Sequence, residues 1–185
     1  MTNIKLSKTD LQDVLIIEPK IFTDERGFFQ ETWNKKDFSQ AIGRSVDFCQ
    51  DNHSHSVYGV LRGLHYQLMR PQCKLIRVLR GAVLDVVVDI RKSSPTFGKH
   101  IAVRLTESNH KQLWIPEGFA HGFFALTATV DFLYKVTEDY NQLDEHCILW
   151  NDLSLKINWR INGTTPKISE KDRKGELFQD ATVFQ

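Results

Sequence analysis

The sequence has few cysteines, no long apolar run and no excess of charge of either sign. Its three cysteines are an odd number without a C-x-x-C pair, which indicates neither a disulfide framework nor a thiolate zinc site. The 24 basic and 23 acidic side chains argue against nucleic-acid binding through bulk charge. No apolar stretch is as long as a membrane span, and the N-terminus does not resemble a signal peptide. We therefore expect a cytoplasmic protein that binds neither nucleic acid nor membranes.

Two common nucleotide-binding motifs are also missing from the chain. The sequence contains neither G-x-G-x-x-G nor G-x-x-x-x-G-K-[ST], so binding of a nucleotide in the Rossmann or P-loop manner is disfavoured. The length of 185 residues is typical of a single domain.

Short apolar segments separated by turn residues fill residues 57–150. The segment KLIRVLRGAVLDVVVDIR (residues 74–91) predicts two strands around a turn, and later segments continue the pattern. Helices are expected only at residues 34–43, which open with Asn and end with Gly, and at residues 169–176, which open with a capping-box spacing. This pattern predicts an antiparallel sandwich or barrel.

Two carboxylates lie inside the most apolar segment of the chain. Asp85 and Asp89 share the strand parity of Val83 and Val87. If this face points inward, each carboxylate must find a partner or stay protonated, and if it points outward, water solvates both. The sequence leaves both alternatives open.

The seven histidines raise the question of a metal site. His53 and His55 have the H-x-H spacing that places two imidazoles on one face of a strand, and His65 or His121 could add ligands. The cupin metal pattern also needs a glutamate shortly after this pair, and none follows. Positions on the surface or in loops are the simpler interpretation for all but His65 and His121, which are embedded in apolar, glycine-bearing sequence.

The segment VLRGLHYQ (residues 60–67) places Arg62 and His65 three residues apart. In a regular strand these side chains point to opposite faces, so they can reach one cavity only if the strand is irregular between them. Gly63 is the residue best able to take a bulged or positive-φ conformation.

Four further residues each have a structural and a functional interpretation. Lys74 fits a solvated strand end or an oxyanion stabiliser, and Tyr134 fits a buried structural tyrosine or a proton donor. Asp172 follows Ser169 at a capping-box spacing, but it could equally orient a catalytic imidazole. Arg26 lies beside aromatic residues, which suits an anionic ligand with a flat ring or an ordinary edge strand.

Eight elements in a fixed order resemble the dTDP-4-dehydrorhamnose 3,5-epimerase family. They are DERGFFQE, QDNHS, VLRGLHYQ, Lys74, RGAVLDVVVDIR, IPEGFAHGF, FLYKVT and ISEKD, and they span residues 24–172. The resemblance implies a mainly β fold, namely a cupin-type antiparallel jelly-roll β-barrel with a few short helices, and it implies neither a catalytic metal nor a cofactor. It also implies a homodimer acting on a dTDP-4-keto-6-deoxy sugar in bacterial dTDP-L-rhamnose synthesis.

The resemblance further implies a division of one domain, residues 1–185. We expect residues 1–50 or so to contribute to the dimer, a barrel at about 50–150, and short helices at about 151–185.

The same resemblance assigns roles to residues of this chain. It implies that His65 is the general base, that Asp172 orients it, that Lys74 lies near the keto oxygen and that Tyr134 is the acid on the opposite face of the sugar. Arg62 corresponds to a phosphate-binding arginine. Further binding residues are Phe22, Arg26 and Glu31, which reach a neighbouring subunit's nucleotide site, and Gln50, Asn52, His121 and Tyr140.

The sequence leaves three alternatives to a 3,5-epimerase open. One is an epimerase acting at C3 only, since such relatives share most of these motifs. Another is a metal-dependent cupin enzyme using His53, His55 and His121, and the third is a non-catalytic sugar-binding cupin.

Overall fold

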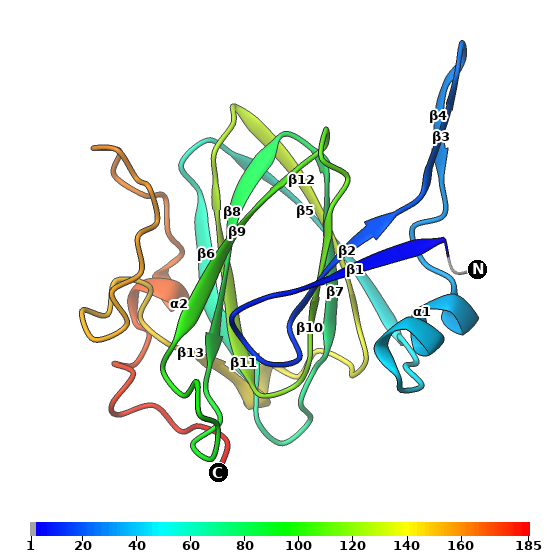
Figure 1. Ribbon diagram of the computed structural model, residues 1–185. Helices are drawn as coiled ribbons and strands as arrows, with labels where there is room; N and C mark the ends of the chain where they lie inside the picture. Colours follow the sequence, from blue (N-terminus) through cyan, green and yellow to red (C-terminus); the bar gives the residue numbers. More distant parts are fainter. Residues whose placement is uncertain (1–2) are drawn as a thin grey trace.

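The computed structural model describes residues 3–185, and most of its regular structure is antiparallel strand (Figure 1). The strands are β1 (Ile4–Lys8), β2 (Leu15–Pro19), β3 (Ile21–Asp24), β4 (Gly27–Gln30), β5 (Gln50–Val57), β6 (Leu61–Gln67), β7 (Lys74–Arg80), β8 (Ala82–Asp89), β9 (His100–Thr106), β10 (Gln112–Ile115), β11 (Phe119–Ala125), β12 (Thr129–Val136) and β13 (Glu145–Cys147). The helical segments are α1 (Lys35–Ile42), η1 (Gln142–Asp144) and α2 (Glu170–Arg173). Among the described residues, no helix has both the length and the apolar character needed to cross a membrane.

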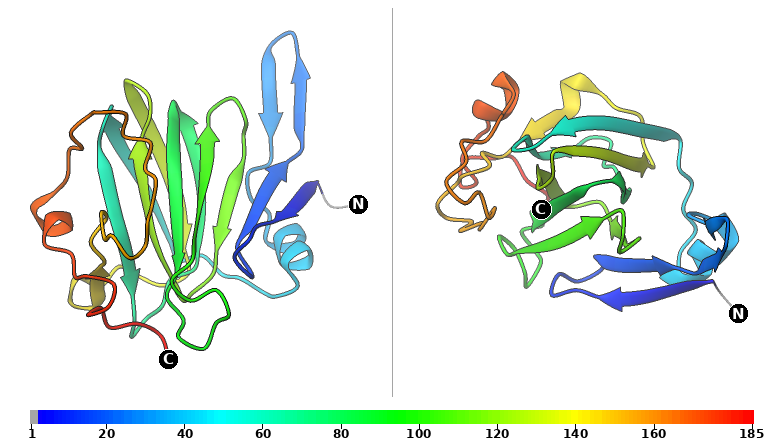
Figure 2. Two further views of the ribbon diagram at one scale, coloured as in Figure 1. Left: turned by 60° about the vertical axis from the view of Figure 1, so that its left-hand side comes forward. Right: turned by 90° about the horizontal axis from the view of Figure 1, so that it is seen from above.

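Two antiparallel sheets face each other and form the body of the molecule (Figure 2). One sheet has the order β1-β2-β10-β7-β12-β5, and the other has the order β13-β6-β11-β8-β9. The first sheet therefore includes β1 and β2, which precede the barrel start that we expected at about residue 50. The reason is burial, because Leu11 and Val14 in the loop between these strands belong to the core between the sheets.

Strand β8 is buried on both faces, which decides the question raised by its two carboxylates. Val83 and Val87 pack in the core between the sheets. Leu84 and Val86 face the other way and are covered by the C-terminal segment, whose Trp159 joins the same cluster. Asp85 and Asp89 are accordingly buried, and the alternative of a solvated face is wrong.

Asp89 obtains its partners from the loop that follows its own strand. Its carboxylate accepts hydrogen bonds from Arg91, Ser94 and Thr96, at distances between 2.6 and 3.0 Å. These bonds hold the pKa of Asp89 below its usual value, although burial alone would raise it. This carboxylate is thus a structural one that anchors the turn.

Both predicted helices begin at their predicted caps, but the second ends at Arg173 and is shorter than the predicted span of residues 169–176. The side chain of Asn34 accepts hydrogen bonds from the backbone amides of Lys36 and Asp37 at the start of α1. Gly43 ends the helix with a φ of 76°. Phe38 of α1 packs on Trp114, so this helix covers one end of the outer face of the six-stranded sheet. The hairpin β3–β4 projects away from the body beside it (Figures 1 and 2).

Candidate active site

A cavity of about 470 Å³ opens where β6 meets the C-terminal segment. Arg62 and His65 of β6 line one part of it, and Ser169, Lys171 and Asp172 line another. The structure therefore brings together Arg62, His65 and Asp172, which are up to 110 residues apart in sequence. The remaining lining residues are Val60, Leu61, Lys167 and Ile168.

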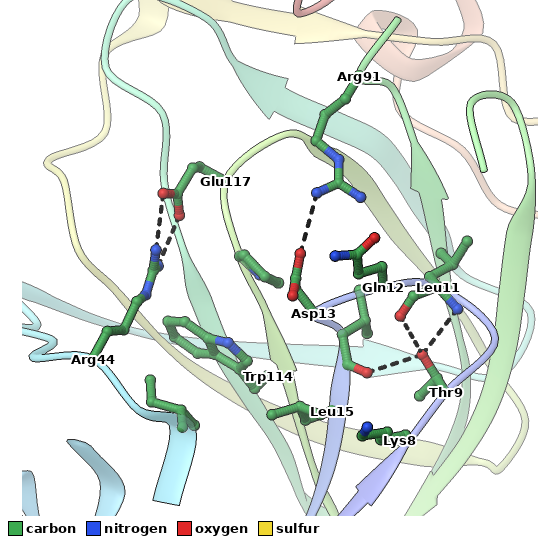
Figure 3. A pocket seen from close by; sticks show the side chains of 13 residues that line it. Lys8, Thr9, Leu11, Gln12, Asp13, Leu15, Arg44, Arg91, Trp114 and Glu117 are labelled. Carbon is green, nitrogen blue, oxygen red and sulfur yellow. Dashed lines mark hydrogen bonds and ion pairs between the residues drawn. The ribbon is translucent and has the colours of Figure 1, made fainter. Parts of the chain in front are cut away.

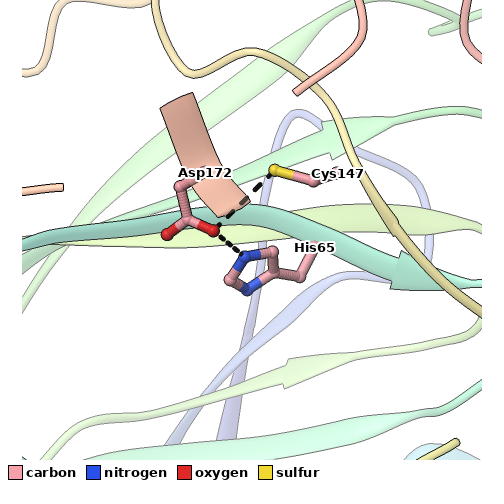
Figure 4. Close-up of side chains that lie close together, drawn as sticks. All are labelled: His65, Cys147 and Asp172. Atoms are coloured by element: carbon pink, nitrogen blue, oxygen red, sulfur yellow. Dashed lines mark hydrogen bonds and ion pairs between the residues drawn. The ribbon is translucent and has the colours of Figure 1, made fainter. Parts of the chain in front are cut away.

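His65 and Asp172 form a short polar contact in this cavity (Figure 4). The distance between His65 Nε2 and Asp172 Oδ1 is 2.6 Å, and Asp172 is 3% exposed. An ionised carboxylate can only accept, so Nε2 carries the proton and Nδ1 keeps a free lone pair. Burial alone would raise the pKa of Asp172, but the hydrogen bond and charge of His65, the amide of Gly63 and the charge of Lys171 together lower it below its usual value. Asp172 thus fixes the orientation of the imidazole, and in the uncharged ring it selects the tautomer that carries its proton on Nε2.

Ser169, and not the carboxylate of Asp172, caps the last helix. Ser169 Oγ accepts a hydrogen bond of 3.1 Å from the backbone amide of Asp172, as the predicted capping box requires. The carboxylate of Asp172 instead accepts from His65 and, at 3.2 Å, from the amide of Gly63. The start of α2 therefore aims this carboxylate at β6.

The strand is irregular at Gly63, which confirms the prediction made from VLRGLHYQ. Gly63 has a φ of 111°, and His121 lies opposite His65 while Phe123 lies opposite Arg62. Gly63 and Leu64 of β6 therefore lie opposite the single residue Gly122 of β11, which is the spacing of a β-bulge. Because of this extra residue, Arg62 and His65 line one cavity despite their opposite parity.

A second buried pair lies one strand further into the sheet. His121, directly opposite His65 on β11, is 2.9 Å from a carboxylate oxygen of Asp85. Burial lowers the pKa of His121 and raises that of Asp85, so each group is pushed toward its neutral form. Asp85 and His121 thus fix each other in an interior from which solvent is almost excluded.

Lys74 is buried at the start of β7, on the facing sheet. Burial lowers the pKa of its amine to about 8, although the negative charges of Asp85 and Glu145 oppose this effect. A solvated strand-end lysine is therefore not what the structure shows. Lys74 is a cation close to its point of deprotonation, held in the interior near His121.

Tyr134 projects from β12, which is also in the sheet facing His65. It is half-buried, and this burial raises the pKa of its phenol, while the charge of Arg62 acts in the opposite direction. Asn52 on β5 lies directly beside it in register, and Gln50 donates to Asn52 at 2.6 Å. The structure thus places Tyr134 on the opposite side of the interior from His65.

The rim of the site contains two residues that sequence analysis missed, Glu145 and Lys171. Glu145 accepts from the hydroxyl of Tyr140 at 2.9 Å and from Lys171 at 2.6 Å. The amide of Tyr140 donates to Gln50, so this network links both sheets. Lys171 could have been suspected because it lies within the ISEKD motif, whereas Glu145 carries no comparable signal.

Of the predicted site residues, only Arg62, His65 and Asp172 line this cavity, and three of the others lie on or directly after the projecting hairpin. Phe22 and Arg26 are on the projecting hairpin β3–β4, and Glu31 follows it. Phe22 is exposed, and the guanidinium of Arg26 pairs with Asp24 of the same hairpin. One chain therefore does not bring these residues to His65.

The three histidines of the metal-dependent alternative are not brought together. His53 and His55 are exposed and both contact Asp131, at 3.3 and 2.8 Å, on the outer face of the six-stranded sheet. His121 lies in the interior with Asp85. The histidines His100, His110 and His146 are half-buried.

A larger pocket, of about 570 Å³, lies elsewhere and is bounded by β2, α1 and the turn after β10 (Figure 3). Its two arginines are already paired, Arg44 with Glu117 at 2.8 Å and Arg91 with Asp13 at 3.5 Å. It contains none of the predicted site residues, so the cavity at His65 is the candidate active site.

Comparison with known proteins decides the family. The family model described as dTDP-4-dehydrorhamnose 3,5-epimerase matches residues 8–180. The chain belongs to the dTDP-4-dehydrorhamnose 3,5-epimerase family. The family, the jelly-roll fold and the isomerase activity predicted from the motifs are thereby confirmed.

Individual members of the epimerase family resemble the whole chain. The Shigella flexneri dTDP-4-dehydrorhamnose 3,5-epimerase is 55% identical and covers 96% of this chain and 97% of its own length. The Legionella pneumophila enzyme, solved in complex with dTDP-4-keto-L-rhamnose, matches with a TM-score of 0.94 at 45% identity and covers 97% of this chain and 95% of its own. A 3'-monoepimerase from Streptomyces bikiniensis, solved with dTDP-quinovose, matches with a TM-score of 0.87 at 31% identity over 92% of this chain and 86% of its own.

Proposed function

We propose that the cavity at His65 converts dTDP-4-dehydro-6-deoxy-D-glucose to dTDP-4-dehydro-L-rhamnose by moving protons at C3 and C5. The observation that carries this proposal is the hydrogen bond of 2.6 Å between His65 and the buried Asp172. It leaves Nδ1 of His65 unprotonated, as a general base requires, and it provides a negative charge for the imidazolium that forms after proton abstraction.

The chemistry needs a base, an oxyanion stabiliser and an acid on the other face of the sugar. The ketone at C4 makes the hydrogens on C3 and C5 acidic, because the carbanion delocalises onto oxygen as an enolate. Lys74 would stabilise that oxyanion with a cation buried in the interior. Tyr134, on the sheet that faces His65, would return a proton from the opposite side. No redox or metal chemistry enters these steps.

The basic residues at the cavity mouth suit a pyrophosphate. Arg62 and Lys171 both line the cavity, Arg62 on β6 and Lys171 on α2. A guanidinium binds phosphate oxygens in a bidentate manner, and an ammonium adds a second positive charge. We assign Gln50, Asn52, His121 and Tyr140 to the sugar and the remaining nucleotide contacts.

We also propose a homodimer in which each hairpin β3–β4 reaches the partner's cavity. Phe22, Phe28 and Phe29 are 46%, 59% and 69% exposed on this hairpin, which is an unusual concentration of aromatic surface for a monomer. Such rings could stack on a nucleotide base while Arg26 meets its phosphates. The free thiols of Cys49, Cys73 and Cys147 support our proposal that the enzyme works in the cytoplasm.

Solvent exchange tests the proposed function directly. In deuterium oxide, the protein should place deuterium from solvent at both C3 and C5 of dTDP-4-dehydro-6-deoxy-D-glucose, as measured by NMR. Exchange at C3 alone would indicate the single-site alternative. Binding without exchange would indicate a sugar-binding cupin, and activity that is lost to a chelator and restored by metal would indicate a metal-dependent enzyme.

A further inference from the structure

A third polar side chain lies beside the catalytic pair and has no part in the proposed reaction. Cys147 on β13 is directly opposite His65 in register, and its Sγ is 4.0 Å from Asp172 Oδ1 (Figure 4). One ligand atom from each of His65, Cys147 and Asp172 lies within 4.8 Å of the others. The three come from different elements, namely β6, β13 and α2.

These atoms form a ligand set that zinc prefers. A nitrogen, a sulfur and a carboxylate oxygen bind Zn²⁺ at about 2.0–2.3 Å, so tetrahedral neighbours lie about 3.2–3.8 Å apart. The contact between His65 and Asp172 would lengthen slightly and the thiol would move inward, both within the reach of a side-chain rotation. Because His65 and Asp172 line an open cavity, an ion can enter and one coordination position stays free for water.

We propose that His65, Cys147 and Asp172 form an inhibitory site for a soft divalent cation such as Zn²⁺. As the S–Zn bond forms, the thiol of Cys147 releases its proton to solvent. Nε2 of His65 also binds the metal, so the imidazole proton moves to Nδ1, the atom that would otherwise act as the base. The bound ion therefore removes the base and the charge of Asp172 together. The inhibition, but not the binding, rests on the proposed role of His65.

Spectroscopy with Co²⁺ and calorimetry with Zn²⁺ test the binding without measuring activity. The wild-type protein should bind one Zn²⁺ in the cavity, and with Co²⁺ it should show a thiolate-to-cobalt charge-transfer band. Cys147→Ser and Cys147→Ala should lose the band and weaken Zn²⁺ binding at least about tenfold, since losing even an outer-sphere partner costs about 10- to 100-fold. Cys49→Ser and His55→Ala, which remove an exposed thiol and an exposed imidazole away from the cavity, should keep both signals. A band of unchanged strength in both Cys147 variants would overturn the proposal.

Activity then separates this proposal from the proposed function. Zn²⁺ should stop deuterium exchange in the wild type, and EDTA should restore it, while Cys147→Ser should retain its basal exchange and resist Zn²⁺. Zn²⁺ binding that depends on Cys147 but leaves exchange untouched would support the site and contradict the role of His65 as base. Equal inhibition of the wild type and both Cys147 variants would refute the site.

Discussion

One histidine–carboxylate pair lies on the outer face of the six-stranded sheet and another lies at the cavity beside β6 of the five-stranded sheet, and the contrast between them shows what makes such a pair useful. On the outer face, His55 contacts Asp131 at 2.8 Å, with the side chains 55% and 22% exposed. On the inner side, His65 contacts Asp172 at 2.6 Å, with the side chains 26% and 4% exposed. The distances are similar, so the difference lies in the surroundings. Water screens the outer pair, whereas the electrostatic attraction in the inner pair acts in surroundings from which most water is excluded.

The largest effect should come from removing the inner imidazole. His65→Ala should lower the rate of deuterium incorporation by about 10²- to 10⁴-fold, the usual contribution of a positioned general base. The matched variant His55→Ala removes an imidazole at a similar distance from a carboxylate and should keep the wild-type rate. Comparable losses in the two variants would remove the distinction between the inner and outer pairs.

Asp172→Asn should have the next largest effect. It keeps the shape of the side chain but removes the negative charge, and a hydrogen bond to a charged group contributes about 1.5–3 kcal/mol, or about 10- to 100-fold in kcat. Ser169→Ala provides the control, since it removes the helix cap and leaves the carboxylate in place. If Ser169→Ala lost as much kcat as Asp172→Asn while both stayed folded, the orienting role would be replaced by a purely structural one.

Replacing Lys74 should raise the stability of the protein and lower its activity. The pH dependence of the stability follows from the pKa of Lys74. The folded-state pKa is about 8 and the usual value is 10.5, so between these values the unfolded chain binds more protons and the stability of the wild type rises with pH. At pH 7 the buried charge of Lys74 destabilises the folded state. The Lys74→Met variant should therefore be more stable than the wild type by about 1–2 kcal/mol, and its stability should not rise between pH 8 and pH 10. Turnover should fall sharply at every pH. Denaturant melts at pH 7 and pH 10 would check this, and Leu79→Met is a control on the same strand.

The smallest effect should come from the outer face. Asp131→Asn removes the carboxylate shared by His53 and His55, yet it should change the free energy of unfolding by no more than about 0.5 kcal/mol and leave kcat unchanged. A loss of activity would show that the outer face communicates with the cavity. Thermal melts and the exchange assay measure both quantities on one sample.

The short apolar segments predicted the strands between residues 57 and 150 but not β1, β2 or β5 before them, and the caps Asn34 and Gly43 fixed one helix to within a residue. The irregularity at Gly63 was also predictable, because two functional side chains of opposite parity demanded it. The pairing of Asp172 with His65 was not, because the spacing from Ser169 explains that aspartate equally well as a helix cap. Cross-sheet contacts such as those of Glu145 depend on how distant segments meet, and local sequence does not encode this.

The glycine that allows the bulge also sets a limit on how this enzyme could be redesigned. A Cβ built on Gly63 would lie 2.6 Å from the backbone of Gly122, and one built on Gly122 would lie 2.6 Å from the backbone of Arg62. Neither strand can therefore gain a side chain here unless the backbones that carry His65 and His121 move apart. A mutant library for altered sugar specificity should leave Gly63 and Gly122 unchanged and vary the other residues that line the cavity.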